Sequence, residues 1–185
     1  MRHYSFAEYH RLTRPSPINK EPITASDRVA YALATGLGAG FTPIAPGTAG
    51  ALEGVAIYLA IYALHPGQSA FLVVLAIINV ILFAVGVWAS NRTCEVTGVK
   101  DPRLIVIDEV SGQLISLTPL ALLPSLSITA VVIGFLLFRL FDIFKPYPIR
   151  KLERLHGGLG VMADDALAGI YAAVLLWLSH LVGLA

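Results

Sequence analysis

Residues 69–90 read SAFLVVLAIINVILFAVGVWAS, a stretch that contains no charged side chain. A helix needs about 20 predominantly apolar residues to cross the hydrocarbon core of a bilayer, and this stretch is long enough. Residues 166–184 form a second stretch of the same kind. The whole chain is 56% hydrophobic and 14% charged, whereas a soluble domain has about 25% charged residues. The sequence therefore predicts an all-α, polytopic helical membrane protein.

Further apolar stretches raise the predicted number of hydrophobic segments to four or five: residues 49–64, 104–123 and 127–138. The stretch over residues 104–123 contains Asp108 and Glu109, so it is either a span or a re-entrant or interfacial segment. If it is counted, the basic loops around it lie with the basic N-terminal tail on the cytoplasmic side, as the positive-inside rule requires. The location of the C-terminus depends on the same choice.

The N-terminal region differs in composition from the rest of the chain. Residues 1–25 are predicted to be a basic, proline-containing cytoplasmic tail, and residues 26–185 a helical membrane-embedded domain. Ser26 or Asp27 is predicted to cap a short helix that runs through Thr35. A net charge of +1 speaks against nucleic-acid binding. Cys94 is the one cysteine, which excludes an internal disulfide and a cysteine-based zinc cluster.

Two pairs of adjacent carboxylates stand in apolar surroundings: Asp108 with Glu109, and Asp164 with Asp165. Ionisable groups at membrane depth are costly, so they indicate a functional site. Carboxylate oxygens are the ligands that Mg²⁺ prefers, and four such side chains could hold one or two ions. The alternative is that the carboxylates lie at the membrane interface and bond to Lys or Arg. We interpret them as metal ligands.

A cluster of cations follows the apolar residues 127–138. Arg139, Lys145 and Arg150 are predicted to bind phosphate, because guanidinium groups form paired hydrogen bonds with phosphate and ammonium groups act as point charges. Arg139, Asp142 and Lys145 are spaced for one helix face, and Pro146 is expected to end that helix. Asp142 would support the cations. The alternative, that the cations mark the membrane edge, does not account for Asp142.

The glycine-rich residues 36–50 are predicted to form a loop between helices. Backbone N–H groups at Gly47 and Thr48, near the expected start of the next helix, could bind a phosphate. The alternative is that small residues let helices pack closely. His156 in a glycine-rich turn is either a proton donor to a leaving group or only a polar loop residue.

These motifs occur in a characteristic order: GLGAG at 36–40 with PIAPGT at 43–48, then Asp108 and Glu109, then R-x-x-D-I-x-K-P-x-P-I-R at 139–150, then H-G-G-x-G-x-M-x-D-D at 156–165. In this order they resemble the phosphatidylglycerophosphatase A family. The resemblance implies a Mg²⁺-dependent enzyme of the bacterial inner membrane, with its site facing the cytoplasm. It would remove the terminal phosphate of phosphatidylglycerophosphate in the lipid bilayer to give phosphatidylglycerol.

The predicted site follows from both lines of argument. Asp108, Glu109, Asp164 and Asp165 would hold Mg²⁺ and, together with His156, form the catalytic set. The substrate phosphates would be bound by Arg139, Lys145, Arg150, Gly47 and Thr48. A transporter or channel that uses clustered carboxylates is an alternative, and so is a non-catalytic lipid-phosphate-binding protein. The clustering of charges at one face favours the enzyme.

Overall fold

The computed structural model describes residues 24–64, 67–100 and 102–183, and every regular element in these ranges is helical. The chain order is α2 (Ala25–Ala34), η1 (Gly36–Phe41), α3 (Pro46–Ala63), α4 (Gln68–Thr97), α5 (Ile107–Leu117), η2 (Thr118–Leu122), α6 (Ile128–Phe144), α7 (Ile149–Leu152) and α8 (Gly158–Leu181). The all-α prediction is confirmed. The predicted tail over residues 1–25 lies almost entirely outside the described residues.

Two helices in the described ranges, α4 and α8, are long and apolar enough to cross a membrane. α4 has 30 residues and α8 has 24. α3 and α6 are shorter, with 18 and 17 residues, and α5 has 11. A helix rises 1.5 Å per residue, so α5 alone is about 16 Å long and cannot cross the hydrocarbon core. The predicted count of four to five membrane segments stays a prediction.

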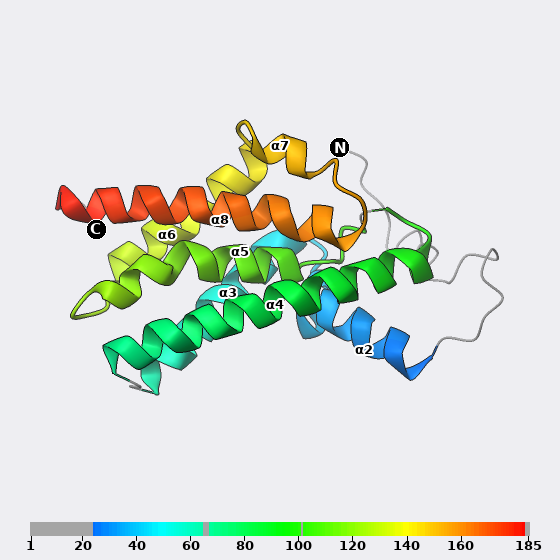
Figure 1. Ribbon diagram of the computed structural model, residues 1–185, viewed down its shortest axis with the longest axis horizontal. Coiled ribbons are helices and arrows are strands. Elements are labelled where there is room, and N and C mark those ends of the chain that lie inside the picture. The colour runs from blue at the N-terminus through cyan, green and yellow to red at the C-terminus, as the bar shows by residue number, and fades with distance from the viewer. Residues whose placement is uncertain (1–23, 65–66, 101, 184–185) are drawn as a thin grey trace.

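The short helix α5 is the centre of the bundle. Figure 1 shows α8 on one side of α5 and α4 on the other, and α5 also contacts α3 and α6. Leu114 and Leu117 of α5 are fully buried in one core with Tyr58, Leu75 and Leu176. An 11-residue helix surrounded in this way can hold polar side chains away from both water and lipid.

Glycines set how closely α5 approaches α8. A Cβ added at Gly169 would lie 2.3 Å from the carbonyl oxygen of Gly112, and a Cβ added at Gly112 would lie 2.7 Å from that of Asp165. No side chain fits in these places, so the two backbones touch. The contact holds the start of α5 beside the acidic turn of α8.

The two ends of the bundle differ. Figure 1 shows the end of α3, the start of α4, the η2–α6 turn and the end of α8 at one end, with α2, the end of α4 and the start of α8 toward the other. α2 is capped by Thr24, which accepts a hydrogen bond from the backbone N–H of Asp27, while the Asp27 carboxylate accepts one from the N–H of Thr24. The prediction of Ser26 or Asp27 as the cap was wrong, because Asp27 occupies the third position of a capping box.

Candidate active site

The starts of α3 and α5 meet inside the protein. Leu104 and Val106 ahead of α5 are buried, and the backbone N–H of Val106 donates to the carbonyl oxygen of Ala34 at 2.9 Å. This bond ties the lead into α5 to the end of α2. α3 begins at Pro46, two residues before Thr48, with the proline in the first turn, where it is well tolerated. A Cβ added at Gly47 would lie 2.3 Å from Oε1 of Glu109, so the first turns of the two helices are in contact.

Three carboxylates converge at this point. One oxygen each of Asp108, Glu109 and Asp165 lies within 4.8 Å of the other two. We call these residues the carboxylate triad. Adjacent helical side chains diverge by about 100°, so Asp108 and Glu109 can share a site only because α8 passes across the first turn of α5. The triad brings Asp165 to two residues that lie 56 and 57 positions before it in the chain.

One oxygen of each triad carboxylate lacks a hydrogen-bond partner. Oδ1 of Asp108, Oε2 of Glu109 and Oδ2 of Asp165 are buried and accept no hydrogen bond from the described residues. Oδ1 of Asp164 is also buried and accepts no hydrogen bond from the described residues. Buried carboxylate oxygens that face one another without a donor are costly, and a bound cation removes that cost. This donor set consists entirely of oxygen atoms and therefore fits Mg²⁺.

Lys145 holds the fourth carboxylate. Its Nζ donates to Oδ2 of Asp164 at 2.6 Å and pairs with Oε1 of Glu153 at 2.9 Å. Lys145 follows the last residue of α6 with a φ of 43°, a left-handed conformation that is uncommon outside glycine. Burial alone would lower the pKa of this ammonium group, but the hydrogen bond and the charge of Asp164 raise it. Lys145 is therefore a permanent cation beside the triad.

Arg139 is a second cation at the triad. A Cβ added at Gly47 would lie 3.1 Å from Nη1 of Arg139, close to its contact with Glu109. Nη1 also donates to Oδ2 of Asp142, one turn further along α6. Asp142 thus orients the guanidinium group, and its supporting role in the site stays a prediction. The result is an acidic triad at the meeting point of two helix N-termini, with Arg139 near Glu109 and Lys145 bonded to Asp164, the neighbour of Asp165.

A protein-family model described as phosphatidylglycerophosphatase A matches residues 32–180. The chain belongs to this family. Phosphatidylglycerophosphatase A of Escherichia coli K12 is 38% identical over 148 residues, which cover 80% of this chain and 81% of that protein. The protein of the same name from Haemophilus influenzae is 40% identical over 148 residues, covering 80% of this chain and 86% of the relative.

A further relative has a different name. The Bacteroides thetaiotaomicron protein is named for phosphatidylinositol-3-phosphatase activity and is 42% identical over 146 residues, which cover 78% of this chain and 89% of that protein. No solved structure matches the chain. The family is therefore established, and the relatives' names differ in the lipid that carries the phosphate.

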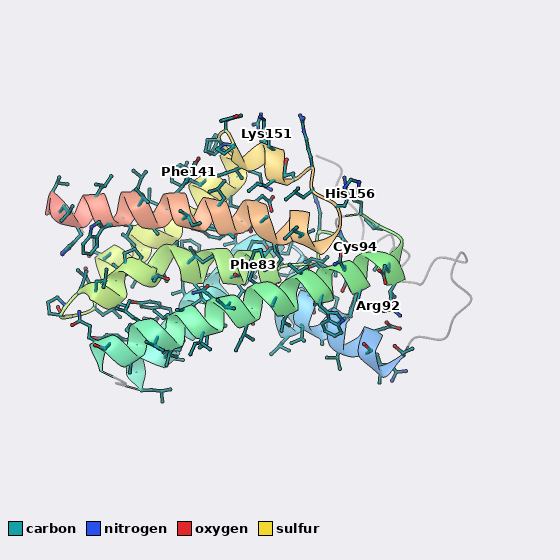
Figure 2. All side chains as sticks on the ribbon, in the orientation of Figure 1. Phe83, Arg92, Cys94, Phe141, Lys151 and His156 are labelled. Atoms are coloured by element: carbon teal, nitrogen blue, oxygen red, sulfur yellow. The ribbon has the colours of Figure 1, made fainter. Side chains whose placement is uncertain are left out.

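The other predicted residues of this family member make no hydrogen bond or ion pair with the triad. Thr48 follows Gly47 at the start of α3 and is half-buried. Arg150 is exposed on α7 and donates to the carbonyl oxygen of Phe144 at 3.4 Å. His156 is exposed in the turn before α8 (Figure 2) and makes no hydrogen bond or ion pair with the described residues. The structure does not bring these three side chains into contact with the triad.

Asn91, near the end of α4, was not predicted from the sequence. Its Oδ1 accepts a hydrogen bond from the backbone N–H of Gly158 at 2.6 Å, and a Cβ added at Gly157 would lie 2.1 Å from that oxygen. α8 has no side-chain cap of its own, so Asn91 satisfies one of the free N–H groups at the start of that helix. The signal in the sequence is weak, because an asparagine at the end of an apolar helix has many possible roles.

Proposed function

We propose that the carboxylate triad is the active site of a phosphatase that removes the terminal phosphate monoester of phosphatidylglycerophosphate, to give phosphatidylglycerol for phospholipid synthesis. The observation that supports it most is the convergence of buried, unpartnered carboxylate oxygens near two cations, in a chain of the phosphatidylglycerophosphatase A family. The clustering of charge in one place also favours an enzyme over a transporter or channel, in which ionisable groups would follow a path across the bilayer.

We propose Mg²⁺ as the cofactor, held by Asp108, Glu109 and Asp165, with the free oxygen of Asp164 as a further ligand. When bound, Mg²⁺ would supply Lewis-acid stabilisation of the phosphate oxygens and lower the pKa of a bound water. The unpartnered oxygens support this assignment, because each of them requires a cation or a donor.

The protein's own residues would bind and orient the monoester. The Arg139 guanidinium group, fixed by Asp142, can donate two hydrogen bonds to a phosphate. Lys145 neutralises part of the charge of the site and holds one oxygen of Asp164 away from the triad. Gly47 leaves room between Glu109 and Arg139, and the N-termini of α3 and α5 favour a bound anion. In the transition state, charge spreads over the phosphoryl oxygens, and these cationic groups would stabilise it.

We also propose four to five membrane segments in the bacterial inner membrane, with the site facing the cytoplasm. The cations of residues 139–154 lie toward the same end of the bundle as the start of α8 (Figure 1). The opposite end carries short turns. This distribution of positive charge supports the orientation. His156 and Arg150 are exposed at the cation-rich end, where they could contact a headgroup that extends from the site.

A second substrate is phosphatidylinositol 3-phosphate, which the name of the Bacteroides thetaiotaomicron relative favours. Both lipids present a phosphate monoester on a diacylglycerol-linked headgroup. They differ in the size of the polyol, an inositol ring in place of a glycerol.

The test is phosphate release from each lipid in detergent micelles, with Mg²⁺ and with EDTA. We expect release from phosphatidylglycerophosphate that requires Mg²⁺ and is lost in Asp165→Asn. The matched control is Glu95→Gln, an exposed carboxylate on α4 away from the triad. Faster phosphate release from phosphatidylinositol 3-phosphate would make that lipid the preferred substrate in place of phosphatidylglycerophosphate. Absence of release from folded protein would favour the non-catalytic lipid-binding protein, and uptake by reconstituted vesicles would favour the transporter.

A further inference from the structure

The glycine-rich loop before α3 has an apolar tip. Leu37, Phe41 and Ile44 are 78%, 45% and 83% exposed. Loops at a protein–water boundary normally present polar side chains, and contiguous exposed apolar residues indicate a contact with lipid or with another protein. The three residues belong to one short segment that begins with η1 and ends just before Pro46.

The backbone of the tip is held in a fixed conformation. The carbonyl oxygen of Thr35 accepts hydrogen bonds from the N–H groups of both Gly38 and Gly40, at 3.1 and 2.9 Å. A Cβ added at Gly40 would lie 2.0 Å from the carbonyl oxygen of Leu104, so the base of the loop is pressed against the lead into α5. Leu37 has a φ of 48°. A leucine kept in this region, with its side chain outside the protein, is a strained arrangement that the surroundings maintain.

The tip adjoins the triad through Gly47. Ile44 lies three residues before Gly47, which contacts Glu109 and Arg139. Leu136, Arg139 and Ile143 are spaced i, i+3 and i+7 on α6 and therefore share one face. Leu136 and Ile143 are 58% and 66% exposed. Arg139 thus reaches the site from a face of α6 whose other side chains are exposed and apolar.

We propose that these two surfaces form an apolar rim that lies in the bilayer, so that the site takes its phosphate monoester sideways from a membrane leaflet. The apolar rim consists of Leu37, Phe41 and Ile44 on the loop and Leu136 and Ile143 on α6. The proposal rests on the proposed function, because a lipid substrate is what makes a lateral entrance useful.

Lipid is the occupant that the observations favour over a second copy of the chain. The α6 face continues toward the opposite end of the bundle through the exposed Val132, as a lipid-facing helix surface does. The cations on and just after α7 suit an anionic leaflet: Arg150, Lys151 and Arg154, all exposed.

The first test does not depend on activity. A bimane label is placed at Ile44→Cys in a Cys94→Ser background, and the protein is reconstituted in vesicles of phosphatidylethanolamine and phosphatidylglycerol. The control label is at Arg103→Cys, an exposed residue in the α4–α5 connection. We expect doxyl-labelled lipid to quench position 44 several-fold more than position 103, and aqueous iodide to do the reverse. Equal iodide quenching at both positions would overturn the proposal.

A label at 44 that is protected from both quenchers, with energy transfer between labelled copies, would also overturn the proposal and assign the rim to a dimer.

The second test is kinetic. Ile44→Ser should reduce kcat/KM on phosphatidylglycerophosphate in vesicles by about tenfold, because a buried apolar contact with lipid is lost. Ile44→Leu should restore it, and half-saturating Mg²⁺ should be unchanged.

Leu64→Ser is the matched control, since Leu64 is equally exposed at the opposite end of the bundle. Full activity of Ile44→Ser, or an equal loss in Leu64→Ser, would contradict a role of the loop tip in lipid capture. If the wild type released no phosphate, the proposed function would fail, and the quenching result would still decide where the rim lies.

Discussion

The two acidic pairs are alike in sequence and differ in what they do. Asp108 and Glu109 lie in the first turn of α5, and both enter the triad. Asp164 and Asp165 lie inside α8, where only Asp165 enters it, while Asp164 bonds to Lys145. The α5 pair faces α3 and α8 together, whereas the α8 pair lies between α5 and the turn that follows α6. The elements packed on each side of a helix therefore decide the role of each carboxylate.

The largest expected effect separates the two members of the α8 pair. Asp165→Asn removes a proposed direct Mg²⁺ ligand, and loss of even an outer-shell partner of a metal site costs 10–100-fold, so activity should fall by more than about 100-fold. Mn²⁺ binding followed by electron paramagnetic resonance should weaken in parallel. Near-normal phosphate release and metal binding in Asp165→Asn would remove the triad from the mechanism.

The second prediction concerns the Lys145–Asp164 pair. Lys145→Met should reduce kcat by about 10–100-fold, because it leaves a buried carboxylate without its partner beside the metal site. The double variant Lys145→Met with Asp164→Asn should be no worse than the poorer single variant, since both remove one interaction.

Glu153→Gln tests the other ion pair of the same lysine. Glu153 is 46% exposed against 7% for Asp164, and exposed ion pairs contribute about 0–1 kcal/mol, so its activity should change by no more than a few-fold. Equal losses of activity in Glu153→Gln and Asp164→Asn would show that the structure assigns the wrong partner to Lys145.

The third prediction concerns a substitution that alters the distance between the two acidic pairs. A Cβ at Gly112 would meet the backbone of Asp165 and the ring of Phe138, so Gly112→Ala should destabilise the protein by about 1–3 kcal/mol. The displacement of Asp165 should also reduce kcat by about 10–100-fold, as sub-ångström to ångström shifts do. Gly134→Ala is the control, because its Cβ would meet only the flexible ends of Leu117 and Leu176. Thermal unfolding and phosphate release measure both effects, and similar activity losses in the two variants would argue against a positioning role for Gly112.

The smallest expected effect concerns Asp27, whose carboxylate is hydrogen-bonded to Thr24 and ion-paired with Arg92. Hydrogen bonds from Thr24, then from Arg92, hold the pKa of Asp27 at about 2, below its usual 3.8. A depressed folded-state pKa contributes stability that is present above about pH 4 and is lost as the pH falls toward 2. Asp27→Asn should therefore lower Tm at neutral pH, and the difference from the wild type should shrink between pH 4 and pH 2. A constant difference across that range would show that the charge of Asp27 is not involved.

Much of the site could be predicted from single residues. Asp108 and Glu109 stand out because apolar surroundings make carboxylates costly, and the structure places both at the triad. Gly47 and Arg139 were also predicted, from the glycine-rich loop and the cation spacing, and they meet there. In each case the residue type and its immediate neighbours contain the physical signal.

What could not be predicted depends on contacts between distant segments. Nothing local distinguishes Asp164 from Asp165, because the choice is made by Lys145 and by the close α5–α8 contact at Gly112. Asn91 acts on a helix that begins 67 positions later. The Thr24 cap was missed because the threonine precedes two other residues that also cap helices well, and only the geometry of Asp27 decides among them.

The left-handed backbone at Lys145 places stability and activity in opposition. That conformation costs a side-chain-bearing residue about 1–2 kcal/mol, and glycine would adopt it freely. Glycine would also remove the ammonium group that restrains Asp164. Because an unpaired buried carboxylate costs more than the strain, the strain can be relieved only when Asp164 is neutralised as well. A library selected for thermal tolerance should therefore enrich glycine at 145 only together with asparagine at 164 and lose activity, whereas one selected for turnover should retain both charged residues.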